Sequence, residues 1–283
     1  MGKYVRKSRK SPLILIVVLV SLVVAGLAAW KIVGIVSEYR EEEAASLALQ
    51  QYIQLDSTQP IATTEPAGTT ENTEDAEYGE NTPTTEATEP APTEAPWSYP
   101  VVDFESLLQL NTDVIGWIYI PDTKVNYPIV QGEDNRHYVS TMVNGNDNAA
   151  GSIFMDYRNR PDFSDRNTVI YGHNMRNGSM FADITKYKNP DYLAEHPTGM
   201  IMMPDGNFRF EVLAATVADL SQAYWQVEFA GDEDFHLWLT SVVADADVTA
   251  GIVPEKDDRV VVLSTCSYEF SDARYVLVCR VME

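Results

Sequence analysis

The stretch VVVLSTCSYEFSDARYVLVCR, residues 260–280, lies near the end of the 283-residue chain and contains both of its cysteines. It begins as an apolar run, passes through the polar residues SYEFSDA, and returns through an arginine into a second apolar run. Two β-branched runs separated by polar residues predict two strands joined by a loop. The first run lacks alternation with polar residues, which indicates a strand that is buried on both faces. If the two strands form a hairpin, Arg274 lies close to Cys266 at the end that carries the loop.

Cys266 and Cys279 allow three interpretations: a disulfide, two buried apolar side chains, or a pair that includes a nucleophile. Side chains alternate between the faces of a strand, so Arg274 and Arg280 share one face and Cys279 lies on the other. A disulfide needs Cα atoms within about 7 Å and converging Cβ vectors. The parity therefore disfavours a bridge, which stays an alternative because exported chains meet oxidising conditions. We expect Cys279 to be a small buried filler and Cys266, at a strand end, to be the reactive candidate.

The N-terminus has the pattern of a membrane anchor. The first ten residues carry five cations and no acid, and residues 11–30 follow without a charge. A helix of that length covers the roughly 30 Å hydrocarbon core of a bilayer, and the basic flank is expected to stay in the cytoplasm. We expect a cytoplasmic tail over residues 1–10 and a transmembrane signal-anchor helix over residues 11–36. A cleaved signal peptide and a buried core helix are the alternatives.

The segment after the anchor changes composition sharply. Residues 41–97 contain thirteen acids and no lysine or arginine, and are rich in threonine and proline. Such a segment cannot bury enough apolar surface to offset its ordering entropy. We therefore expect a disordered acidic spacer over residues 37–97 that holds the folded part away from the membrane. A helical continuation over residues 41–54 is the alternative for its first part.

Residues 98–283 are long enough for one domain with a sizeable core. They hold 28 acidic against 13 basic residues, which argues against nucleic acid as a partner. Apolar patterns predict strands and helices in the stretches that follow. Strands are expected at 116–120, 125–130, 152–156 and 168–173 and in a hairpin across 205–206, and helices at 104–110, 180–187, 191–196 and 232–246. Many strands with short helices and no regular βαβ repeat favour a mainly β domain (α+β), with a closed barrel as one solution.

A thiol nucleophile needs a base, which is ordinarily a histidine. Of the four histidines, His173 follows the apolar run TVIY and a glycine, so it stands at a strand end as Cys266 does. For the other three, a surface or core position is the simpler interpretation (His137, His196 and His236). The sequence has no HExxH, CxxC, P-loop or GxGxxG motif, so we expect neither a metal nor a cofactor.

Three stretches together resemble the sortases, most closely class B: NTDVIGWIYIPDTKVNYPIVQGEDNRHY, NTVIYGHNMRNGSMF and LSTCSYEFSDAR, with GSIFMDYRN between them. The resemblance covers residues 101–283, and the N-terminal anchor and spacer also fit this family of Gram-positive surface transpeptidases. The long stretch with the helix at 232–246 resembles the class B insertion. Two departures are Val262, where the family motif has threonine, and the short step of eight residues from Cys266 to Arg274.

The resemblance implies an eight-stranded β-barrel with added helices, in which Cys266 is the nucleophile and His173 the general acid/base. Arg274 would orient the substrate and stabilise the oxyanion. The implied activity cuts a C-terminal sorting signal of the NPxTx kind after threonine, through a thioacyl enzyme. The implied clients are surface proteins or pilins, and the acceptor is an amine of lipid-linked peptidoglycan precursor or a pilin lysine. Weaker candidates for the substrate groove are Asn174, Ser264, Thr265, Asn135 and Tyr268.

These inferences place the protein in the cell membrane as a single-pass protein with an extracellular catalytic domain. An L,D-transpeptidase is the nearest enzymatic rival, but its SHGC-like run is absent. A cysteine peptidase that only hydrolyses differs in whether water or an amine accepts the acyl group. A non-enzymatic wall-associated module with a Cys266–Cys279 disulfide is the remaining alternative.

Overall fold

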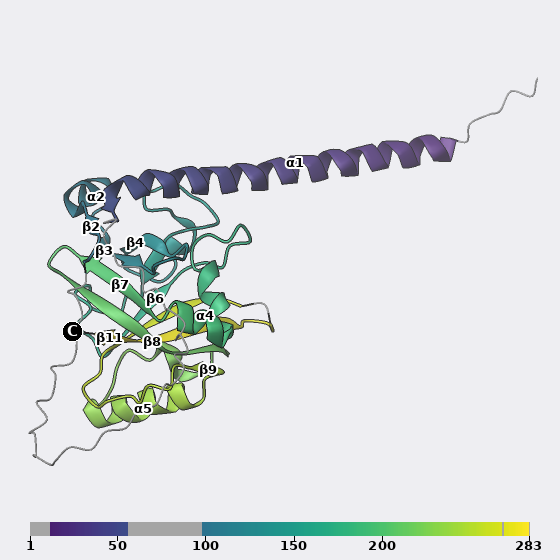
Figure 1. Ribbon diagram of the computed structural model, residues 1–283. Helices are drawn as coiled ribbons and strands as arrows, with labels where there is room; N and C mark the ends of the chain where they lie inside the picture. Colours follow the sequence, from purple (N-terminus) through teal and green to yellow (C-terminus); the bar gives the residue numbers. More distant parts are fainter. Residues whose placement is uncertain (1–11, 56–97, 268, 283) are drawn as a thin grey trace, which may run out of the picture.

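The computed structural model describes residues 12–55, 98–267 and 269–282 (Figure 1). Most of the strands belong to one sheet, with these bounds: β3 (Val114–Tyr119), β4 (Asn126–Val130), β5 (Ile153–Met155), β6 (Asn167–Tyr171), β7 (Thr198–Met203), β8 (Gly206–Ala218), β9 (Val248–Thr249), β10 (Val260–Cys266) and β11 (Arg274–Met282). The spatial order is β11-β10-β6-β5-β4-β3-β7-β8-β9, and an additional pairing of β11 with β8 closes eight of these strands into a barrel. The mainly β class with a closed eight-stranded barrel is thereby confirmed.

Short helices fill the connections between the strands. They are α2 (Phe104–Leu110), α3 (His137–Ser140), η2 (Ala182–Lys188), α4 (Pro190–Glu195), η3 (Ala223–Trp225) and α5 (Asp232–Ala244). The helices expected at 104–110, 191–196 and 232–246 are confirmed, whereas the stretch expected at 180–187 forms 3-10 turns as η2. Asp103 caps α2 by accepting a hydrogen bond from the Ser106 amide at 3.0 Å, as an N-cap aspartate does.

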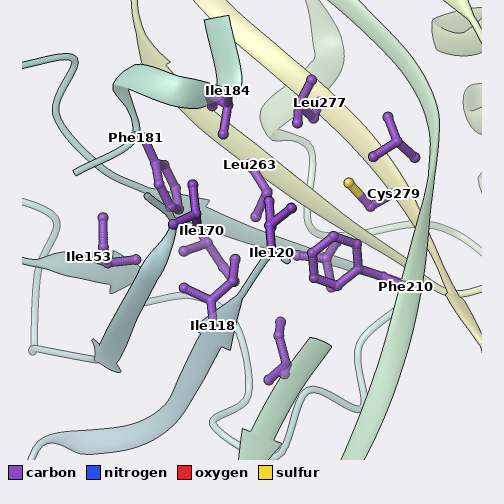
Figure 2. Close-up of a cluster of buried hydrophobic side chains, with 14 of the residues drawn as sticks. Ile118, Ile120, Ile153, Ile170, Phe181, Ile184, Phe210, Leu263, Leu277 and Cys279 are labelled. Carbon is purple, nitrogen blue, oxygen red and sulfur yellow. The ribbon is translucent and has the colours of Figure 1, made fainter. Parts of the chain in front are cut away.

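Two apolar layers bury both faces of the terminal hairpin. Inside the barrel, Leu263 and Leu277 pack with the side chains labelled in Figure 2. On the outer face, Val262 and Val276 pack against α5 through Phe235 and its neighbours. Both faces of β10 are therefore shielded from water, which explains why apolar and polar residues do not alternate in its sequence.

A long helix, α1 (Pro12–Leu49), precedes the barrel, and its N-terminal part projects away from it (Figure 1). By length and composition, the chain over residues 16–52 is able to cross a membrane, with a mean hydropathy of 2.5 in its most apolar window. Its C-terminal end packs on the barrel. Gln50, in η1 (Gln50–Tyr52), forms two hydrogen bonds with Asn126 of β4. Its Nε2 donates to the backbone carbonyl of Asn126 at 2.9 Å, and its Oε1 accepts from the Asn126 side chain at 2.7 Å.

The expected start of the spacer at residue 37 differs from the structure. Residues 37–49 continue α1, and β1 (Ile53–Gln54) then pairs antiparallel with β2 (Val101–Val102). The acidic composition of the wider segment concealed a short run, ASLALQQYI, whose apolar side chains pack on the barrel through Leu49, Tyr52 and Ile53. The remainder of the expected spacer, 56–97, lies outside the described residues. The described residues on either side of it pair with each other as β1 and β2, and the C-terminal end of α1 lies against the barrel.

Candidate active site

Cys266 and Arg274 lie together at the loop end of the β10–β11 hairpin. They are direct cross-strand partners, as a hairpin connection requires, and the Ser267 amide donates to the Ala273 carbonyl at 2.9 Å to close the loop. Directly opposed residues point to the same face, with Cβ atoms about 4.5–5.5 Å apart. Nη1 of Arg274 donates to the carbonyl of Ala273 at 3.1 Å and to that of Asp272 at 3.3 Å. The loop carbonyls thus hold the guanidinium at the end of the hairpin, in the pocket that Cys266 also lines.

His173 reaches the same place because β6 lies parallel to β10. Tyr171 pairs with Ser264, and the Gly172 amide then donates to the Ser264 carbonyl at 3.1 Å. The Thr265 hydroxyl donates to the Gly172 carbonyl at 2.6 Å. The residue after Gly172 therefore leaves the sheet beside the end of β10, where Cys266 stands. A parallel pair between strands so far apart in sequence leaves no local signal in the chain.

Gly172 is the residue that permits this close approach. A Cβ at this position would lie 2.4 Å from the Ile153 side chain and 2.7 Å from the Phe181 ring. Real side chains do not approach so closely, and Phe181 is fully buried and unable to move aside. The glycine before His173 is therefore a packing requirement at the strand end.

The imidazole of His173 is held by a backbone carbonyl. Its Nε2 lies 2.8 Å from the carbonyl oxygen of Val139, near the end of α3. A carbonyl can only accept a hydrogen bond, so this contact requires a proton on Nε2. The contact therefore assigns Nδ1 as the nitrogen available for proton exchange.

A pocket of about 310 Å³ opens over these residues. Its polar lining contains Cys266, His173 and Arg274 together with three of the expected groove residues, Asn135, Ser264 and Thr265. Asn174 is not part of this lining, and its Nδ2 donates to the Cys266 carbonyl at 3.0 Å. Tyr268, also expected in the groove, lies outside the described residues.

The apolar side of the pocket was not foreseen from the sequence. It is formed by Val139, Phe154, Tyr171, Leu220 and Trp225. The indole Nε1 of Trp225 donates to Ser264 Oγ at 3.1 Å, which ties the loop after β8 to the strand that carries Cys266. The signal that the sequence offered was the aromatic pair Tyr224 and Trp225 in the stretch after β8.

A buried carboxylate organises one wall of the pocket. Asp156 is fully buried and accepts hydrogen bonds from Asn135 Nδ2 at 3.0 Å and from the Tyr171 hydroxyl at 2.9 Å. It also binds Arg158, with contacts at 2.8 and 2.9 Å. Burial alone would raise the pKa of the Asp156 carboxyl, but the hydrogen bonds, foremost those from Arg158, lower it below the usual value. An ionised Asp156 therefore fixes the two pocket residues that bind it.

Cys279 lies far from this site. It pairs with Val261, its side chain is fully buried, and its sulfur faces the core in Figure 2. Both cysteines are free thiols, so the disulfide alternative is wrong. Burial raises the pKa of the Cys279 thiol, which keeps it protonated and unreactive. The expected role of Cys279 as a buried apolar residue agrees with this position.

Comparisons with known proteins lead to one family. The family model for the Sortase domain matches residues 118–282. Sortase B of Listeria monocytogenes is 40% identical over 167 residues, covering 59% of this chain and 68% of the relative. Sortase B of Staphylococcus aureus is 29% identical over 182 residues, covering 64% and 75%.

Solved structures agree with the sequence comparison. The Staphylococcus aureus sortase B–substrate complex has a TM-score of 0.60 and 28% identity, with 64% of this chain and 84% of that one covered. Clostridium perfringens sortase B has a TM-score of 0.60 and 30% identity, with 64% and 100% covered. With the family model matching more than half of it, the chain belongs to the sortase family of cysteine transpeptidases.

Proposed function

We propose that the protein is a class B-type sortase that cuts a C-terminal sorting signal of the NPxTx kind after threonine and transfers the cleaved protein to an amine. The observation that carries this proposal is the meeting of three strand ends in one pocket. β10 supplies Cys266, β11 supplies Arg274, and the residues after β6 supply His173. A thiol, an imidazole and a guanidinium are the groups that amide-bond exchange requires.

In the first half-reaction, the Cys266 thiolate attacks the carbonyl carbon of the threonine. A bond forms between Sγ and that carbon, and the negative charge on the carbonyl oxygen is stabilised by Arg274. The amide C–N bond then breaks as the His173 imidazolium donates its proton to the leaving nitrogen. The product is a thioester on Cys266.

In the second half-reaction, an amine attacks the thioester carbon. A C–N bond forms, the C–S bond breaks, and the neutral His173 imidazole accepts the proton that the amine loses. The Cys266 thiolate is regenerated. The acceptor is an amine of lipid-linked cell-wall precursor or a lysine of a pilin subunit.

The pocket fits an extended peptide with apolar and polar positions. Its apolar wall, with Trp225 and Leu220, suits a proline side chain, and Asn135, Ser264 and Thr265 form the polar side of the groove. Residues 11–36 serve as the membrane anchor with the N-terminus in the cytoplasm, and the barrel acts on the outer side.

Product analysis with the full chain in detergent tests the proposal. A panel of NPxTx, SPxTx and LPxTx peptides is incubated with and without an added amine, and the products are identified by mass. We expect cleavage after threonine and a new amide when the amine is present, with no product from Cys266→Ala. Hydrolysis that is unchanged by the amine would instead identify a peptidase, and cleavage at another bond would refute the proposed signal.

A further inference from the structure

The loop that carries His173 is braced from outside the barrel. It leaves β6 at Gly172 and returns to the sheet region at Phe181, whose amide donates to the His173 carbonyl at 2.8 Å. The Phe181 side chain is fully buried in the core (Figure 2). The hydrogen bond between Phe181 and His173 ties the two ends of the loop to each other, and the path of the loop from His173 to Met180 depends on other contacts.

The tip is held by a glutamate of α1. Nδ2 of Asn177 donates to Oε2 of Glu42 at 2.9 Å. The other end of the same amide, Oδ1, accepts from the Ser179 amide at 3.1 Å and from its hydroxyl at 2.8 Å. Asn177 therefore links the loop to the helix, with its Nδ2 bound to α1 and its Oδ1 bound within the loop.

Glu42 is unusual among the acids of α1. It is only 4% exposed, whereas Glu41 and Glu43 beside it are exposed. Burying a carboxylate is costly unless it is hydrogen-bonded, so its contact with Asn177 stabilises it in this position. The helix thus carries a buried acceptor directed at the His173 loop.

The same loop is also tied to Tyr127 of β4, which faces α1. The Met180 amide donates to the Tyr127 hydroxyl at 2.9 Å, and Ser46 of α1 lines the cavity that Tyr127 and Met180 share. Met180 has a φ of 56°, a conformation that side chains other than glycine rarely adopt. The hydroxyl therefore helps to hold a strained backbone in the loop.

Apolar packing between α1 and the barrel is incomplete. A cavity of about 180 Å³ lies between them, lined by Glu42, Ser46, Tyr127 and Met180 among others. The apolar contacts of α1 with the barrel lie at its C-terminal end, at Leu49, and the hydrogen bond from Asn177 is what joins the helix to the loop beside this gap.

We propose that Glu42 is a positioning residue for His173, so that the end of the anchor helix is part of the catalytic unit. This inference rests on the proposed role of His173 in proton transfer. α1 is one continuous helix from Pro12 to Leu49, so the segment that would cross the membrane and the segment that braces the loop form a single element. Loss of the brace lets the imidazole move relative to Cys266.

A polarity swap across the contact tests this directly in the full chain. Asn177→Asp keeps the acceptor for Ser179 but places a second carboxylate against Glu42. Glu42→Gln keeps an acceptor for Asn177 and, combined with Asn177→Asp, supplies the donor that the single variant lacks. Glu43→Gln removes an exposed charge one position along the same helix and is the matched control.

We expect Asn177→Asp to lower kcat for peptide cleavage about 10-fold, with KM within about twofold, since small misplacements of a catalytic group act on the chemical step. The double variant should return to within about twofold of the wild type, and Glu43→Gln should match the wild type. The pH profile of Cys266 alkylation should shift in Asn177→Asp and recover in the double variant. A purely structural role would lower the thermal midpoint without moving that profile.

Equal kcat and equal alkylation profiles for Asn177→Asp and the wild type would overturn the inference, as would a double variant no better than Asn177→Asp. The alkylation readout needs no substrate. If the wild type cleaves none of the peptides, the proposed function fails, and the alkylation profiles alone still decide whether Glu42 positions His173.

Discussion

The two ends of the β10–β11 hairpin hold the two cysteines of the chain in opposite surroundings. At the loop end, Cys266 is partly exposed in a pocket beside Arg274. Toward the other end, Cys279 is fully buried in the barrel core opposite Val261. The same residue type is thus accessible or fully buried according to its register and its face of the strand.

This difference shows what makes a thiol available for chemistry. Burial favours the neutral thiol, so Cys279 has a raised pKa and no access to solvent. Cys266 instead stands at a strand end, in a pocket that solvent reaches, with Arg274 as its direct cross-strand partner. The following predictions test this contrast.

The largest effect is expected from removing each thiol in turn. Cys266→Ala should lower peptide cleavage by at least about 10⁴-fold, because it removes the group that forms the covalent intermediate. Cys279→Ala should leave kcat within about threefold of the wild type. Steady-state cleavage by the two purified variants, with thermal midpoints as the folding control, measures this. Comparable losses in both would contradict the division of roles.

Thiol labelling tests the same contrast without a substrate. Under native conditions iodoacetamide should modify Cys266 about 10³-fold faster than Cys279, because only the former is accessible and beside a cation. In guanidinium chloride the two rates should converge. Peptide mapping after timed quenching gives both rates, and similar native rates would mean that Cys279 is not shielded as the structure shows.

Arg274 should contribute less than the nucleophile. Arg274→Ala should lower kcat/KM about 10²–10³-fold, the loss typical of one oxyanion donor. Arg274→Lys keeps the charge but not the planar donor, so partial activity is expected. Cleavage kinetics of both variants, with native labelling of Cys266 alongside, separates a role in the transition state from one in thiolate formation. Full activity in Arg274→Ala would remove this residue from the mechanism.

The smallest effect concerns stability at high pH. Since the folded-state pKa of Cys279 lies above its ordinary value of 9.0, its stabilising contribution is complete below pH 9 and is lost as pH rises further. Cys279→Ala should cost about 1 kcal/mol at pH 7, from the lost packing. Above pH 9 the wild type should lose about 1.4 kcal/mol more per pH unit than this variant. Denaturant unfolding from pH 7 to 10 measures both slopes, and parallel curves would contradict the burial of the thiol.

Local patterns in the sequence were sufficient for this hairpin. The apolar runs, the loop between them and the alternation of faces predicted that Arg274 approaches Cys266 and that Cys279 points away. Those inferences depend only on residues near one another in the chain. For the same reason the strand leading to His173 could be recognised, but its parallel pairing with β10 could not.

Contacts between distant segments were missed because no periodic pattern encodes them. Asp156 could be placed at the end of the strand expected at 152–156, but its binding of Asn135 and Tyr171 depends on how three segments meet. Likewise the acidic composition around Glu42 favoured a solvated spacer over the alternative of a helical continuation across residues 41–54, whereas the structure continues α1 to Leu49 with this glutamate buried. The composition of a segment describes its residues on average, so it does not reveal that one of them is buried.

The location of the covalent intermediate tests the central contrast most directly. The full chain is incubated with an NPxTx peptide, quenched in acid, digested and mapped by mass. A peptide fragment ending in threonine attached to Cys266, absent in His173→Ala and with Cys279 unmodified, is the expected result. An adduct on Cys279, or turnover with no adduct on Cys266, would contradict the assignment of the nucleophile.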